Sequence, residues 1–169
     1  MSATRDIAAS YLRPFDVLRR RLSGPPREDR ALAYLMGGCL VVFIAQWPRL
    51  SREAHLDPSM PLDARLGGAL MAWVFFVPLA LYLVAFVTHV AGFAVTRRGT
   101  AYGARVALFW ALLASGPLWL LHGLTAGFVG PGPALNAVGA VLAVGFLFLW
   151  GAGLAVVYGR PLEPGRGEA

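Results

Sequence analysis

The chain has 169 residues, of which 57% are hydrophobic and 14% are charged, and its formal net charge is +6. A soluble domain of this size uses fewer apolar side chains, so the composition predicts an all-α, polytopic helical membrane protein. The single cysteine, Cys39, excludes an internal disulfide, and no acidic cluster accompanies a histidine, so neither a metal site nor a cofactor is expected.

Residues 1–30 form a basic segment that predicts an amphipathic helix at the membrane surface. Apolar residues recur every three or four positions along one helical face, with arginines around them. The members of this face are Ile7, Tyr11, Phe15, Leu18 and Leu22. Because proline favours the first position of a helix, Pro14 is expected to start a second short helix over residues 14–22. The alternative is a disordered basic arm that only fixes the orientation of the chain.

Four apolar segments without charged residues predict a four-span bundle over residues 31–159, followed by a tail at 160–169. The spans cover residues 31–47, 66–95, 106–129 and 133–159. At about 1.5 Å per residue the first is a little shorter than a ~30 Å hydrocarbon core, and the others exceed it. The second span is expected to be one tilted or kinked helix, with its kink at Pro78.

The distribution of arginine, which supplies every basic side chain, predicts the orientation. Four spans put the N-terminal segment, the loop 96–105 and the tail on one side, with seven, three and two arginines, and leave three arginines on the other side. The positive-inside rule then predicts a bacterial inner-membrane protein with both termini in the cytoplasm.

The basic side is expected to contact the lipid bilayer through anionic lipids, with a membrane protein or a second copy of the chain as further possible partners. Nucleic acid is not expected, because the arginines flank apolar spans. The expected contact residues are Arg13, Arg19, Arg20, Arg21, Arg97, Arg98 and Arg105.

The third span carries polar and helix-interrupting residues that predict packing. Gly116 and Pro117 predict a bend, with Ser115 hydrogen bonding back to its own helix. A short turn joins the third and fourth spans as an antiparallel hairpin, so His122 and Asn136 are expected at similar depth with a hydrogen bond between them. Ser115, Pro117, His122 and Asn136 are therefore assigned to packing between helices.

Glycines in the same span predict close approach of neighbouring helices. Gly123 and Gly127 form a GxxxG pattern, and small residues at this spacing allow backbones to pack closely. In a chain rich in alanine and glycine, contacts within the chain are expected before oligomerisation.

Catalysis is not expected. His89 and His122 differ in depth by roughly 15 Å, which disfavours a shared metal or proton relay, and the role of His89 stays open. Ser115 with His89 invites comparison with intramembrane serine proteases, but a nucleophile needs an aligned base and oxyanion donors, which these residues do not establish. The predicted spans also hold no Asp, Glu, Lys or Arg for an ion-coupled transporter.

The middle loop and third span carry a family resemblance. A glycine-rich loop with a small hydroxyl residue and an aromatic leads into a span with a helix-interrupting proline. The matching residues are Gly99, Thr100, Tyr102, Arg105 and Pro117. In this pattern, over roughly residues 30–158, the chain resembles the Yip family of integral membrane proteins, and within it a small bacterial branch.

The resemblance implies an all-helical bundle without a cofactor. Eukaryotic relatives are associated with small GTPases and membrane traffic. The usual family pattern has five spans and a C-terminus on the opposite side, whereas this sequence predicts four.

The expected function is therefore that of a non-catalytic inner-membrane protein that organises lipid or a membrane partner through its arginines. The alternative is a permeation protein for a small neutral or apolar solute. It would be lined by the bend at Ser115–Pro117 and by His122, and it predicts a continuous polar cavity between helices.

Overall fold

A computed structural model of the chain describes residues 3–23 and 25–159, and every regular element in this part is a helix. The elements are α1 (Ala3–Leu12), α2 (Pro14–Leu22), α3 (Glu28–Leu56), α4 (Leu62–Met71), the π-helix η1 (Ala72–Phe76), α5 (Val77–Thr96), α6 (Ala101–Ala114), α7 (Gly116–Phe128) and α8 (Pro133–Tyr158). The predicted tail, residues 160–169, lies outside the described residues.

Three helices of the described chain are long and apolar enough to cross a membrane. They are α3, the continuous run Leu62–Thr96 formed by α4, η1 and α5, and α8. The pair α6 and α7 passes the same test jointly, and its two helices meet at an angle of 44°. The protein is thus an all-helical, multi-pass membrane protein with three spans, or four if the bent pair crosses as one.

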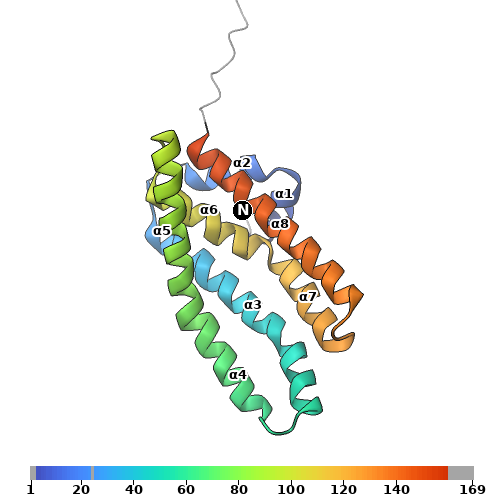
Figure 1. The fold of residues 1–169 in the computed structure, drawn as a ribbon. Coiled ribbons are helices and arrows are strands. Elements are labelled where there is room, and N and C mark those ends of the chain that lie inside the picture. Colours follow the sequence, from blue (N-terminus) through green and yellow to red (C-terminus); the bar gives the residue numbers. More distant parts are fainter. Residues whose placement is uncertain (1–2, 24, 160–169) are drawn as a thin grey trace, which may run out of the picture.

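The helices form a bundle with two distinct ends (Figure 1). At one end, called the basic end below, lie α1, α2, the end of α5, the start of α6 and the end of α8. The turns joining α3 to α4 and α7 to α8 lie at the other end, called the far end. Helix α6 is the central element: most of its residues are buried, and it packs against α3, α5 and α8.

Two prolines show how the long helices depart from the expected spans. Helix α3 continues through Pro48 to Leu56, nine residues beyond the predicted span. The expected kink at Pro78 is instead a π-turn that ends two residues before it. Proline cannot donate to the carbonyl of residue i−4, here Val74, and its ring crowds that carbonyl. A π-turn at this position relieves both problems while the helix continues.

The N-terminal helices pack onto the bundle. Helix α2 begins at Pro14 and ends at Leu22, as predicted. However, Leu18 belongs to the hydrophobic core together with Val17, and both are about 1% exposed. Tyr11 and Phe15 remain exposed. The apolar face that was expected to lie on lipid is therefore divided between lipid and the bundle, because α1 packs on α6 and α2 packs mainly on α8.

Candidate lipid-contact surface

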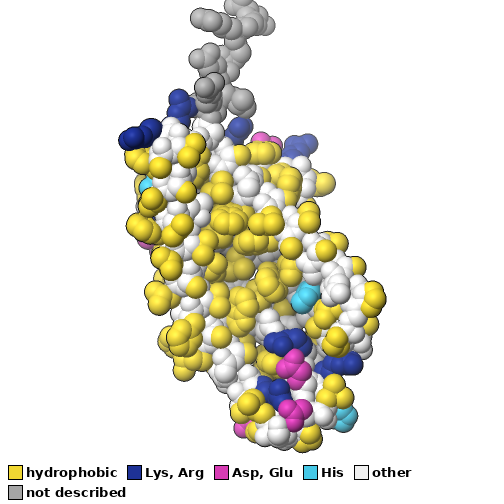
Figure 2. Space-filling model, in the orientation of Figure 1, with side chains coloured by type: hydrophobic (Ala, Val, Ile, Leu, Met, Phe, Trp, Pro, Cys, Tyr) yellow, Lys and Arg dark blue, Asp and Glu magenta, His cyan; other side chains and the backbone are white. Residues whose placement is uncertain are grey.

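Four of the arginines expected to contact lipid are exposed at the basic end. They are Arg13, Arg19, Arg97 and Arg98, and their side chains have no partner among the residues the structure describes. Arg97 ends α5 in the left-handed conformation, with φ of 56°. Figure 2 shows basic side chains along the upper rim of the visible face, above a surface that is mostly hydrophobic.

Arg21, from the same run of three arginines, faces the protein interior. Its side chain is 13% exposed, and Nη2 lies 2.6 Å from the Oδ2 atom of Asp6. Nη1 donates to the hydroxyl of Tyr34, and the guanidinium carbon lies 3.5 Å from the centre of the Trp110 ring. The guanidinium thus joins α2 to α1, α3 and α6, so its position does not support the expected lipid contact. Arg20 is half exposed and lies 3.6 Å from Asp6.

Buried polar contacts complete the attachment of α1. The indole of Trp110 donates to the hydroxyl of Ser10 over 3.0 Å, and that hydroxyl donates to the carbonyl of Asp6. The Tyr11 hydroxyl donates to the carbonyl of Ala114, the last residue of α6, over 2.8 Å. Burial raises the pKa of Tyr11, so the hydroxyl stays a donor at neutral pH. Polar groups removed from water need such partners, which makes this attachment specific.

Arg105 is also used within the protein. Its Nη2 atom pairs with Glu28 at the start of α3, and its side chain is about one quarter exposed. This ion pair joins the first turns of α6 to those of α3. The expected contact surface is therefore reduced to the four exposed arginines, with Arg20 at its edge.

The arginines of the far end are all paired. Arg49 lies 2.8 Å from Glu53, and Arg65 lies 3.6 Å from Glu53 and 3.2 Å from Asp57. Arg52 donates to the carbonyl of Gly127 over 3.3 Å. Figure 2 shows basic and acidic side chains intermixed near the lower end. Carboxylates therefore compensate most of the positive charge of the arginines at the far end. At the basic end, the four exposed arginines have no such carboxylate among the described residues.

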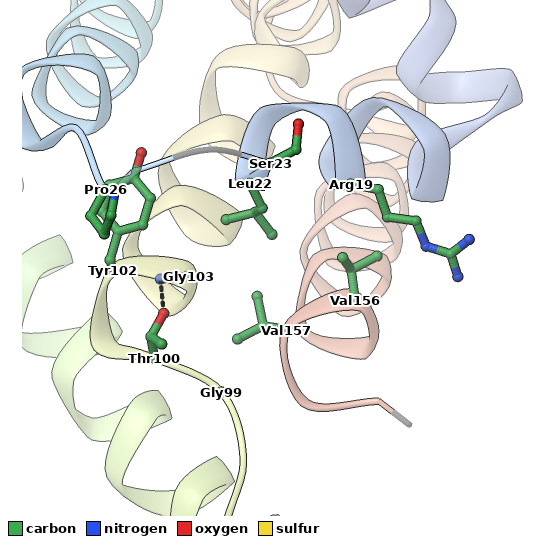
Figure 3. A pocket seen from close by; sticks show the side chains of 10 residues that line it. All are labelled: Arg19, Leu22, Ser23, Pro26, Gly99, Thr100, Tyr102, Gly103, Val156 and Val157. Carbon is green, nitrogen blue, oxygen red and sulfur yellow. Dashed lines mark hydrogen bonds between the residues drawn. The ribbon is translucent and has the colours of Figure 1, made fainter. Parts of the chain in front are cut away.

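A cavity of about 430 Å³ opens at the basic end, between α2, the start of α6 and the end of α8 (Figure 3). It is lined by Arg19, Leu22, Ser23, Pro26, Gly99, Thr100, Tyr102, Gly103, Val156 and Val157. The aliphatic side chains of Leu22, Val156 and Val157 form its centre in this view. The Thr100 hydroxyl caps α6 by accepting from the N–H of Gly103 over 3.0 Å. Polar groups thus surround an apolar floor.

Ser115 and the bend occur as expected from the sequence. The Ser115 hydroxyl donates to the carbonyl of Leu112 over 2.9 Å, and the side chain is fully buried. Pro117 stands near the start of α7, directly after the break between α6 and α7. A buried hydroxyl engaged with its own helix does not line an open path, so this geometry does not favour the permeation alternative.

The expected hydrogen bond between His122 and Asn136 is not formed. Asn136 is exposed, and His122 has no hydrogen-bond partner among the described residues. The Nε2 atom of His122 instead lies 3.5 Å from the place where a Cβ atom would stand at Gly139, and its ring meets Trp119 edge-on. This is an ordinary van der Waals distance, so the imidazole rests against α8 at Gly139. His122 therefore packs between α7 and α8 without the polar pairing.

His89 has a partner that the sequence did not indicate. Its Nδ1 atom lies 3.0 Å from the hydroxyl of Tyr158, 69 positions away on α8. The ring of Tyr158 lies so close to Gly92 and Gly99 that a Cβ atom at either would come within 3 Å of it. The contact joins the end of α5 to the end of α8 beside the cavity.

The glycine pair of α7 packs within the chain, as expected. A Cβ atom at Gly123 would stand 1.8 Å from the carbonyl oxygen of Ala45, and one at Gly127 would stand 2.3 Å from Cβ of Pro48. Both contacts are made with α3. These glycines allow α7 to lie directly on the backbone of α3.

Together, the fold and this surface define a class: a multi-pass helical membrane protein whose two ends differ in uncompensated positive charge. In comparisons with protein-family models, curated proteins and solved structures, nothing matches the chain.

Proposed function

We propose that the protein is a non-catalytic inner-membrane protein of the Yip-like type that organises anionic lipid at its basic end, which would face the cytoplasm. One observation carries this proposal, namely the difference between the two ends. Arg13, Arg19, Arg97 and Arg98 are exposed without a described partner, while Arg49 and Arg65 at the far end are paired with carboxylates.

Electrostatics favours anionic lipid as the partner of this surface. A basic side chain near an anionic leaflet contributes about 1 kcal/mol, or a preference of about fivefold. An arginine already paired with a carboxylate presents little net charge to lipid. The exposed arginines at the basic end therefore supply most of the attraction.

Exposed apolar side chains beside these arginines support a position at the membrane interface. Tyr11 and Phe15 are 37% and 45% exposed, and Leu12 is 85% exposed. Aromatic rings and basic side chains favour the headgroup region of a bilayer. The N-terminal helices would therefore contact lipid with their outer surface while their inner surface holds the bundle.

The test is a comparison of bound lipid in two matched variants. Arg13→Gln with Arg97→Gln and Arg98→Gln removes three charges from the basic end. Arg49→Gln with Arg52→Gln and Arg65→Gln removes three from the far end. Each protein is extracted with its native lipids into polymer nanodiscs, and the ratio of phosphatidylglycerol to zwitterionic lipid is measured by mass spectrometry.

We expect enrichment of phosphatidylglycerol around the unaltered protein, its loss in the basic-end variant and its retention in the far-end variant. Thermal unfolding followed by tryptophan fluorescence checks that both variants are folded. Equal enrichment in the unaltered protein and in a folded basic-end variant would disprove the proposal.

A further inference from the structure

We propose that the cavity at the basic end seats one phospholipid with an anionic headgroup, its phosphate at the polar rim and its glycerol region on the apolar floor. The inference rests on the proposed function and deepens it, because it replaces a diffuse attraction with a single defined site. It is argued from the lining of the cavity, its size and the charges around it.

The rim offers hydrogen-bond donors and a cation. Arg19 is exposed and has no partner in the described part of the chain, and the partly buried Tyr102 makes no side-chain hydrogen bond there, although it interacts electrostatically with Arg27. Figure 3 shows the hydroxyls of Tyr102 and Ser23 pointing to the same side, away from Leu22 and Val157. The Ser23 hydroxyl donates to the carbonyl of Arg20 over 2.7 Å, so Tyr102 is the hydroxyl that can donate to a ligand on this side. A phosphate only accepts hydrogen bonds, so a guanidinium and a hydroxyl donor on the rim suit it.

The lining of the cavity carries no negative charge among the residues that the structure describes. None of these lining residues is acidic, and the first turn of α6 contains no acidic residue. The nearby carboxylate of Glu28 is engaged with Arg105. A zwitterionic headgroup would bring an ammonium group to a lining whose described residues offer no carboxylate to receive it, so this lining selects for net negative charge.

The floor and the size favour a lipid over a free anion. Leu22, Val156 and Val157 present aliphatic surface below the rim, which a free phosphate ion would leave unused. A volume of about 430 Å³ lies in the range of sites for small ligands. It holds a headgroup and glycerol, while the acyl chains extend into the bilayer along the exposed apolar surface of the helices.

The cavity lies where a bound lipid would contact both the N-terminal helices and the rest of the bundle. Its walls come from α2, the connection between α5 and α6, the start of α6 and the end of α8. A molecule bound there contacts segments that are far apart in sequence. Because it binds only the folded arrangement, it stabilises the attachment of the N-terminal helices to the bundle.

The test counts lipids on the intact protein by native mass spectrometry. The detergent-purified chain is mixed with phosphatidylglycerol or with phosphatidylcholine. Two single substitutions at the basic end form a matched pair: Arg19→Gln removes a charge at the cavity, and Arg13→Gln removes one outside it. Ser23→Trp keeps the charge and fills the rim.

We expect one phosphatidylglycerol to bind the unaltered protein and Arg13→Gln with equal affinity. Arg19→Gln should bind it about fivefold more weakly, which corresponds to about 1 kcal/mol, and Ser23→Trp should lose it. Phosphatidylcholine should not occupy the site, and added inorganic phosphate should not displace phosphatidylglycerol. Thermal unfolding without added lipid should be unchanged in Arg19→Gln.

Equal weakening by Arg19→Gln and Arg13→Gln would overturn the cavity site. So would tight binding by a folded Ser23→Trp variant, equal binding of phosphatidylcholine, or displacement by inorganic phosphate. These failures are distinct from failure of the proposed function, because the nanodisc variants retain Arg19. Enrichment of phosphatidylglycerol that depends on Arg13, Arg97 and Arg98 can persist when the cavity site is disproved. Conversely, a lipid can bind in the cavity when no such enrichment is found.

Discussion

The guanidinium carbon of Arg21 lies 3.5 Å from the centre of the Trp110 ring, and both side chains are largely shielded from solvent. The same guanidinium pairs with Asp6 and donates to Tyr34. The N-terminal helices are therefore an integral part of the helical bundle, not an appendage that could be removed without effect on its stability.

Arg21→Gln should destabilise the protein by about 2–4 kcal/mol, because it removes the stacking on Trp110 and leaves the Asp6 carboxylate only its longer, half-exposed ion pair with Arg20. The measurement is thermal unfolding in detergent, followed by tryptophan fluorescence and circular dichroism. Arg19→Gln is the matched control and should unfold like the unaltered protein. Equal unfolding temperatures for Arg21→Gln and the control would show that the stacked ion pair does not hold α2 in place.

Gly123→Ala should destabilise the bundle by about 2 kcal/mol or more, because the new methyl group would stand 1.8 Å from the carbonyl oxygen of Ala45 and force α7 away from α3. Gly151→Ala is the control, since a Cβ atom there would meet nothing within 4 Å. Unfolding with increasing dodecyl sulfate measures both. A variant at Gly123 as stable as the one at Gly151 would contradict the close packing of these helices.

Acid should loosen the turn between α3 and α4. Hydrogen bonding by Ser59 and the charge of Arg65 hold the pKa of Asp57 below its ordinary value of 3.8. Because the folded pKa is the lower one, the stabilisation is complete above the ordinary value and is lost as the pH falls through the folded pKa. We expect hydrogen exchange of residues 56–62, corrected for intrinsic rates, to increase toward about pH 3.

Asp57→Asn should give fast exchange in this turn already at neutral pH, with little further change on acidification. Asp63→Asn is the control, because the side chain of Asp63 has no hydrogen-bond or ion-pair partner among the described residues. If Asp57→Asn retains the pH dependence of the unaltered protein, another group is responsible.

The bent pair α6 and α7 should cross the membrane completely. In a Cys39→Ala background, Ser59→Cys, Arg98→Cys and Pro131→Cys place one thiol in each exposed connection. A maleimide that does not cross membranes should label the variants at Ser59 and Pro131 from one side, and the variant at Arg98 from the other. Labelling at Pro131 from the same side as Arg98 would mean that α6 and α7 form a re-entrant loop and that the chain has three spans.

Local signals made much of the fold predictable from the sequence. Pro14 starts α2, Gly116 and Pro117 mark the bend, and a short turn pairs α7 with α8, because each depends on a few neighbouring residues. The extension of α3 through Pro48 was missed because charged residues follow it, and the predicted span was bounded by apolarity.

The candidate site was less predictable. Arg19, Arg20 and Arg21 are equivalent in the sequence, and only the packing of α2 decides which one faces Trp110. The contact between His89 and Tyr158 depends on how two distant helix ends meet. The charge of the basic end follows from composition, whereas the division between exposed and internal arginines follows from tertiary structure.

The π-turn at Ala72–Phe76 also has a consequence for how the chain tolerates changes in length. A π-turn holds one residue more than the α-helical turn it replaces, so it is equivalent to a single-residue insertion that the helix has accommodated. Everything after it is rotated by about 100° relative to an uninterrupted α-helix. The π-turn, which ends nine residues earlier, therefore sets the direction in which Ala85, the one buried residue of α5, points from its helix.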